Sequence, residues 1–171
     1  HVVDLSANST LSLDAQVAAT QHAMQAGAEI IFQATLADGE LVGHADFLRK
    51  VPRPSALGDW GYEVLDTKLA RSPKAKFVVQ LGFYSALLTK AQGAAPRQMH
   101  VVLGSGEELP YRCADYAHYL ERITAQFLAR VQGEITGTYP APCDKCSQCR
   151  WRGLCDERRL KDDHLSQVAG I

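Results

Sequence analysis

The stretch "YEVLDTKLA" (residues 62–70) is the sequence feature that most limits the folds open to this chain. Tyr62, Val64 and Leu65 favour a pleated, half-buried strand, yet Asp66 and Lys68 follow two residues apart. Because strand side chains alternate between faces, positions 66 and 68 point the same way. Such pairs on strands are common as surface ion pairs. The alternative is a strand that brings a carboxylate and an amine to one place for chemistry.

The segments around this strand alternate between helix and strand patterns. Residues 37–40, which contain Asp38 and Gly39, predict a tight hairpin turn. Helix-capping signals are Ser12, Gly27 and Ser72, with Pro73 at a first helical position. The predicted order is helix 11–28, strands 29–36, 41–51 and 62–70, helix 72–92, strands 98–104 and 109–114, and helix 115–132. This order predicts one α/β domain over residues 1–171, with a mixed sheet and helices packed on it.

Composition excludes some function classes. Hydrophobic residues make up 46% and charged residues 22% of the 171 residues, as in ordinary soluble proteins. The net charge of −1 does not indicate a dedicated nucleic-acid module, although basic residues gather at 48–53, 68–76 and 149–161. These clusters can equally be solvated surface. We find no apolar run long enough for a membrane span and no signal peptide, and we expect a cytoplasmic protein. Because the chain starts at His1, we expect a larger parent protein.

Asp46 adds a second carboxylate on the hairpin strand before Asp66. If the two strands pair, both carboxylates and Lys68 converge at one place. Two carboxylates make a hard oxygen site of the kind that Mg²⁺ or Mn²⁺ prefers. Gln80 and Tyr84, four residues apart, share one face of the next helix. A satisfied core glutamine is the alternative for Gln80.

Three short motifs carry a resemblance to a known family. "GHAD" (43–46), "EVLDTK" (63–68) and "QLGFY" (80–84) resemble motifs of the PD-(D/E)XK nuclease superfamily. More narrowly, they resemble RecB-like nucleases, in which Q-x-x-x-Y follows the D-x-K strand. The resemblance runs from about residue 29 to the C-terminus, and it implies a restriction-endonuclease-like fold.

The resemblance also implies roles for individual residues. Asp46 and Asp66 would bind Mg²⁺ or Mn²⁺, and Lys68 would be the catalytic lysine. Gln80 and Tyr84 would support the site and the substrate phosphates. The implied activity is metal-dependent hydrolysis of DNA, on single strands or ends, in repair, recombination or processing. Fused or associated helicase or RNase H-like domains are the implied partners.

One feature departs from the family pattern at the metal site. Many members carry a motif histidine on a helix ahead of the hairpin, but the neighbours of His22 do not look like that motif. We interpret His22 as an ordinary helix residue and expect the motif histidine upstream of His1. Glu63 lies on the opposite strand face by alternation, so we assign it no metal role.

Four cysteines lie within 13 residues and predict a C-terminal metal knuckle over residues 139–160. Cys146, Cys149 and Cys155, spaced C-x2-C-x5-C, resemble the C-terminal part of the iron–sulphur motif of some RecB-like nucleases, in which a distant N-terminal cysteine is the fourth ligand. No cysteine precedes Cys113 in this sequence, so Cys143 either replaces that ligand or is a bystander. The full run C-x2-C-x2-C-x5-C is similar to ferredoxin-type spacing. A structural zinc site is the alternative to a 4Fe-4S cluster. We interpret the fifth cysteine, Cys113, as a small core residue in a strand. The four candidate ligands are Cys143, Cys146, Cys149 and Cys155.

A rival function stays open from the sequence. The chain could be a catalytically silent nucleic-acid-binding or scaffolding module that keeps the fold without the activity. The missing motif histidine favours this alternative, and the presence of Asp46, Asp66 and Lys68 opposes it. The sequence leaves open the polarity of cleavage, exonuclease versus endonuclease action, and DNA versus RNA.

Overall fold

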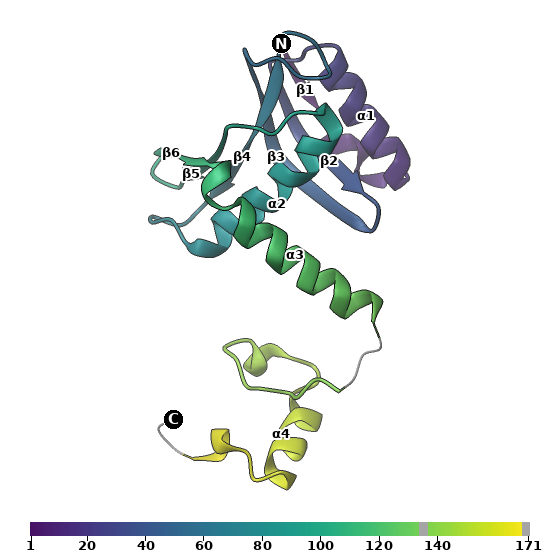
Figure 1. Ribbon diagram of the computed structural model, residues 1–171. Helices are drawn as coiled ribbons and strands as arrows, with labels where there is room; N and C mark the ends of the chain where they lie inside the picture. The colour runs from purple at the N-terminus through teal and green to yellow at the C-terminus, as the bar shows by residue number, and fades with distance from the viewer. Residues whose placement is uncertain (134–136, 169–171) are drawn as a thin grey trace. The chain divides into compact units, whose positions relative to one another are not determined.

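The computed structural model describes residues 1–133 and 137–168, and residues 1–125 contain a six-stranded sheet (Figure 1). Neighbouring strands follow chain order across the sheet. β1 runs parallel to β2, and β4 runs parallel to β5, whereas the other neighbours are antiparallel. The predicted mixed sheet is therefore confirmed. The strands are β1 (Val2–Asp4), β2 (Ile30–Asp38), β3 (Leu41–Val51), β4 (Gly61–Lys68), β5 (Gln98–Leu103) and β6 (Glu108–Arg112).

The helices are α1 (Leu13–Gln25), α2 (Ala75–Gln92), α3 (Ala117–Gln132) and α4 (Arg152–Lys161). In α1, Ser12 is the N-cap as predicted, and its side chain accepts a hydrogen bond from the Ala15 N–H. The predicted start of α2 is wrong. Lys74 is the N-cap there and makes no side-chain cap bond, so Ser72 and Pro73 precede the helix. Residues 69–74 connect β4 to α2 and contain the bends at positions 69, 71 and 72.

Sequence patterns missed two short elements and misplaced Cys113. β1 has only three residues, and α4 overlaps the cysteine-rich segment, for which the sequence patterns predicted a metal knuckle and gave no helix. Cys113 is not in a strand, since β6 ends at Arg112 and a 3-10 turn begins at Cys113. Its side chain is nevertheless half-buried and packs against the core.

The core lies between α2 and the sheet, with α1 packed on β2 (Figure 1). α2 packs on β2 to β5, through fully buried side chains such as Leu81 and Leu88. The Gln92 amide fixes the start of β4, because its Oε1 accepts from the Tyr62 N–H at 2.7 Å and its Nε2 donates to the Tyr62 carbonyl at 3.3 Å. The Tyr62 hydroxyl donates to the Ala28 carbonyl at 2.7 Å. These bonds satisfy polar groups that burial would otherwise leave unpaired.

An ionic network occupies the sheet face that carries Glu63. His100 lies between two carboxylates, with Nε2 3.0 Å from Glu63 Oε2 and Nδ1 2.8 Å from Glu108 Oε1. The Arg49 guanidinium donates two hydrogen bonds to Glu108. Burial raises the pKa of Glu63, but the bonds from His100 and Gln98 outweigh it and leave the pKa below its ordinary value. Glu63 is thus committed to this network.

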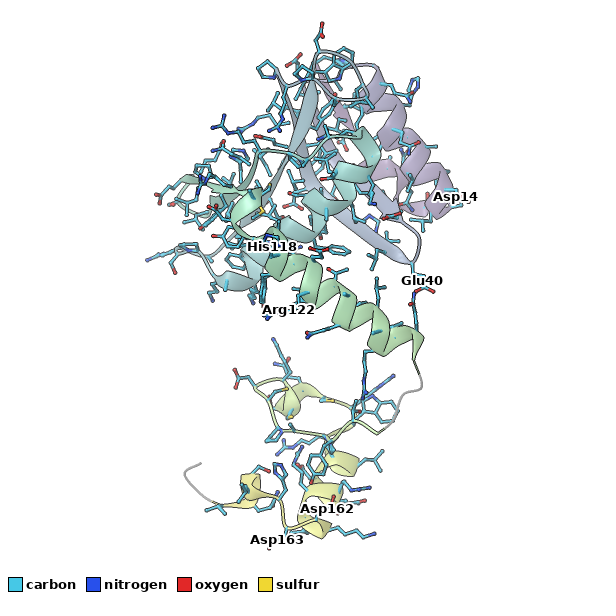
Figure 2. The ribbon with its side chains drawn as sticks, viewed as in Figure 1. Asp14, Glu40, His118, Arg122, Asp162 and Asp163 are labelled. Carbon is cyan, nitrogen blue, oxygen red and sulfur yellow. The ribbon has the colours of Figure 1, made fainter. Side chains whose placement is uncertain are left out.

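The chain divides into two compact units, His1–Ala125 and residues 126–171, and the second holds the cysteines. Within the second unit, the buried Arg159 donates to the Pro140 carbonyl at 2.6 Å and pairs with Asp156. Asp162, labelled in Figure 2, pairs with Arg158 at one end of α4. No helix among the described residues is both long and apolar enough to span a membrane.

Candidate active site

The site lies where β3 and β4 separate. Their ladder runs from Val51–Gly61 to Phe47–Leu65 and ends there, while β4 continues to pair with β5. Beyond the last pair, the Asp46 carboxylate, rather than a backbone carbonyl of β3, accepts the hydrogen bond of the Thr67 N–H. Its Oδ2 accepts from the Thr67 N–H at 3.0 Å and from the Thr67 hydroxyl at 2.9 Å.

A change of strand face accompanies this separation. Leu48 and Ala45 are both fully buried in the core although they are three residues apart, which strict alternation forbids. Their partners on β2, Ile31 and Ala34, are also both buried. Between them, Gln33 has a φ of 57°, in the left-handed region. The strands therefore change face beside Asp46, and this distortion frees its carboxylate to reach β4.

Asp66 is almost fully buried on β4, with 2% of its surface exposed. Burial raises its pKa to about 6, with further raising from the neighbouring Asp46 carboxylate and opposition from Lys68. At Asp46, burial also raises the pKa, but the contacts with Asp66 and Thr67 prevail and hold it below its ordinary value. The two carboxylates thus form a coupled pair in which Asp66 holds its proton more strongly.

Lys68 links the carboxylates to α2. Its ammonium forms an ion pair with Asp66 and donates a hydrogen bond to Gln80 Oε1 at 3.0 Å. It also lies 5.5 Å from the centre of the Phe77 ring. The amine is therefore held on three sides, by a carboxylate, an amide oxygen and an aromatic face.

Gln80 and Tyr84 extend this chain of contacts along α2. Gln80 Nε2 donates to the Tyr84 hydroxyl oxygen at 2.9 Å. The Tyr84 ring lies against Gly43 of β3, where a Cβ atom would come within 2.6 Å of the ring. Gly43 therefore leaves the space that the ring needs, which explains why this position has no side chain.

The structure thus brings the five predicted residues together in one connected set. These are Asp46, Asp66, Lys68, Gln80 and Tyr84. Sequence reasoning missed Thr67, because alternation placed it on the opposite face from Asp66. It also gave no role to Gly43, although "GHAD" contains it.

The donor set fits a divalent cation. Asp66 Oδ2 is buried and makes no hydrogen bond, although it is paired with Lys68. The Lys68 ammonium is one positive charge beside two carboxylates, and the Asp46 carboxylate still raises the pKa of Asp66, so a divalent ion would supply the positive charge that the pair lacks. No group of three or more His, Cys, Asp or Glu side chains suited to a metal occurs in the described ranges. Two carboxylates are nevertheless enough for Mg²⁺, which keeps several waters and also uses substrate phosphates.

The predicted cysteine ligands do not form such a group in the described part of the chain. The Cys143 and Cys146 sulphurs lie 4.0 Å apart, and the Cys143 N–H donates to Cys146 Sγ at 3.3 Å. Convergence of all four thiols stays a prediction. His22 is exposed at the last turn of α1, as expected for an ordinary helix residue.

Comparison with known proteins assigns the family. A search of curated proteins found no match. The family model described as "PD-(D/E)XK nuclease superfamily" matches residues 5–156, which covers every strand from β2 to β6 and the whole candidate site. Members of this superfamily are generally nucleases. On this match, the chain belongs to the PD-(D/E)XK nuclease superfamily.

Proposed function

We propose that this protein is a metal-dependent nuclease that hydrolyses phosphodiester bonds of DNA, on single strands or at ends, in DNA repair, recombination or processing. The observation that carries the proposal is the connected set Asp46–Asp66–Lys68–Gln80 at the point where β3 and β4 separate. The set combines two carboxylates with one ammonium, and the family assignment supports nuclease activity in general.

Asp46 and Asp66 would hold the cation, which is Mg²⁺ or Mn²⁺ on the chemistry of the donors. When bound, such an ion supplies positive charge that polarises a phosphoryl oxygen and lowers the pKa of water. Thr67 acts on Asp46 by occupying its Oδ2 with two hydrogen bonds, which fixes the orientation of the carboxylate. Asp66 must be ionised to serve as a ligand, so its raised pKa makes occupancy of the site depend on pH.

Lys68 would stabilise the negative charge that grows on the phosphate. Its ammonium lies beside Asp66, one of the two carboxylates that would hold the cation, and a phosphate bound to that cation would be within its reach. Gln80 and Tyr84 are positioning residues in this account. Gln80 holds the amine through its Oε1, and Tyr84 holds the Gln80 amide. The Tyr84 ring is itself seated on Gly43.

The cysteine segment would be a structural site rather than a catalytic one. We propose that Cys143, Cys146, Cys149 and Cys155 hold a 4Fe-4S cluster, with Zn²⁺ as the alternative. The support is their spacing and their position in one short segment, in which Cys146 begins a 3-10 turn, Cys155 lies in α4 and few apolar side chains are buried. A larger protein with helicase or RNase H-like domains would be the setting for such a nuclease.

The test is cleavage of end-labelled single-stranded DNA with Mn²⁺ or Mg²⁺. We expect metal-dependent cleavage by the full chain and a loss of at least about 100-fold in Asp66→Asn and Lys68→Met. The control is Asp59→Asn, because Asp59 is exposed and remote from the site. A chain that binds DNA but does not cleave it with either metal would support the silent-module alternative. Equal cleavage by Asp66→Asn would place the activity elsewhere.

A further inference from the structure

Charge is distributed unevenly along the chain. Overall, 18 Lys and Arg nearly balance 19 Asp and Glu. Residues 67–106, however, contain six Lys or Arg and no Asp or Glu. This acid-free stretch begins directly after Asp66 and includes all of α2. Its cations are Lys68, Arg71, Lys74, Lys76, Lys90 and Arg97.

Arg71, Lys74 and Lys76 lie in the segment between two site residues, Lys68 and Gln80. Lys68 ends β4, and α2 begins at Ala75 and presents Gln80 to the site. Arg71, Lys74 and Lys76 are exposed, and none of them pairs with a carboxylate in the part of the chain that the structure describes. Lys76 precedes Gln80 by four residues, so both lie on the same side of α2.

One apolar side chain in this segment is fully exposed. Leu69 directly follows Lys68 and has 99% of its surface exposed, the largest value among the exposed large hydrophobic residues of the described chain. The backbone around it is anchored, since the Gly104 N–H donates to the Ala70 carbonyl at 3.2 Å. A Cβ atom on Gly104 would come within 2.8 Å of the Leu69 carbonyl oxygen. The backbone of Leu69 therefore lies close against Gly104.

We propose that residues 69–76 form a grip for a single DNA strand beside the scissile phosphate. Arg71, Lys74 and Lys76 contact the phosphates that flank the site, and Leu69 packs against the face of an adjacent base. This inference rests on the proposed nuclease function and adds the residues that select the substrate. The unpaired cations fit a polyanion, and an apolar side chain among them fits an exposed base face.

The same arrangement discriminates against duplex DNA. Base faces are available in a single strand, whereas in a duplex they are covered by stacking, and an apolar side chain must first unstack them. The cations bind phosphates of either form. Leu69 is therefore the residue that confers preference for single strands, and the three cations supply the salt-dependent affinity.

The test measures DNA binding without divalent metal, so that it does not depend on cleavage. Fluorescence anisotropy of a labelled oligonucleotide in EDTA, over a range of salt concentrations, compares single-stranded with duplex DNA. The test variants are Leu69→Ala and the triple variant R71Q/K74Q/K76Q. The matched controls are Leu160→Ala, which removes a leucine that is 71% exposed, and Lys90→Gln, which removes a cation near the other end of α2.

The triple variant should reduce the slope of log affinity against log salt by about 2, because each phosphate that is no longer neutralised lowers the slope by roughly 0.7. Leu69→Ala should keep the slope but weaken single-strand binding by roughly 5-fold, with little change for duplex. Circular dichroism confirms that each variant is folded.

Variants that bind as the two controls do would overturn the grip, and so would a weakening by Leu69→Ala that is equal for duplex. Equally tight binding of an RNA strand of the same sequence would overturn the assignment to DNA. These outcomes are distinct from failure of the nuclease function, which would leave strand binding intact but abolish cleavage.

Discussion

Asp66 makes the folded protein less stable as pH rises, and Asp66→Asn should remove this effect. Its pKa of about 6 lies above the ordinary 3.8. The folded state therefore binds the proton more tightly than the unfolded state does. This favourable linkage is fully present below pH 3.8 and is lost as pH rises through 6. At about 1.4 kcal/mol per pKa unit, the ionised carboxylate costs about 3 kcal/mol at neutral pH in the absence of metal.

Asparagine keeps the shape of the side chain and an oxygen that can accept from Lys68, but it never ionises. We expect Asp66→Asn to be more stable than the wild type by about 1–3 kcal/mol at pH 7.5, because the variant no longer carries an ionised buried carboxylate. The gain stays below the full value because Lys68 pairs less strongly with a neutral amide. The difference should shrink toward zero near pH 4. Urea denaturation of both proteins in EDTA, between pH 4 and 8, gives this difference directly.

Asp59→Asn is the control, because this exposed residue should show no such trend. A difference between Asp66→Asn and the wild type that stays constant from pH 4 to 8 would refute the reasoning. It would mean that burial and Asp46 do not perturb the Asp66 carboxyl.

Three further predictions concern the supports of the site and the cysteine segment. Gly43→Ala should displace the Tyr84 ring, break its bond to Gln80, lower the cleavage rate, measured by kcat, and destabilise the fold by about 1–3 kcal/mol. Gln92→Leu should destabilise the fold by about 1–3 kcal/mol in urea denaturation, because it leaves the buried Tyr62 N–H without a partner. Removing metal with a chelator should expose residues 139–160 to protease before the first unit is cut, because burial alone cannot order that segment.

Each of these predictions has a matched control. Gly153→Ala adds a methyl group to open space and should leave kcat unchanged. Gln25→Leu alters an exposed glutamine of α1 and should change stability by less than about 0.5 kcal/mol. For the cysteine segment, iron, sulphide and zinc analysis after anaerobic purification identifies the metal. Equal protease protection with and without chelator would show that the cysteines do not organise the segment.

Local patterns predicted much of the fold because each rests on a few neighbouring residues. The Asp38–Gly39 turn predicted the β2–β3 hairpin, and the D-x-K spacing placed Asp66 and Lys68 on one face of β4. Alternation alone could not show the change of face beside Asp46. The left-handed residue there is Gln33, and glutamine, unlike glycine or asparagine, gives no signal of a left-handed backbone.

Other features depend on contacts between distant segments. The two hydrogen bonds from Thr67 to Asp46 arise only because the ladder between β3 and β4 ends, and that is a property of the sheet. The packing of the Tyr84 ring against Gly43 is also a contact between distant segments, because it joins α2 to β3. Ser72 and Pro73 carried a valid capping pattern, but the chain uses those positions for the bend that follows Lys68.

Binding of Mn²⁺ tests most directly whether Asp46 and Asp66 share one cation. Titration of the metal-free protein, followed by the loss of the free-ion electron paramagnetic resonance signal, gives the number of sites and their affinity. At pH 7.5 we expect one site that is lost in both Asp46→Asn and Asp66→Asn and kept in Asp59→Asn. Its affinity should fall steeply as pH drops below about 6, where Asp66 takes up a proton. Undiminished Mn²⁺ binding by the two site variants would contradict the account.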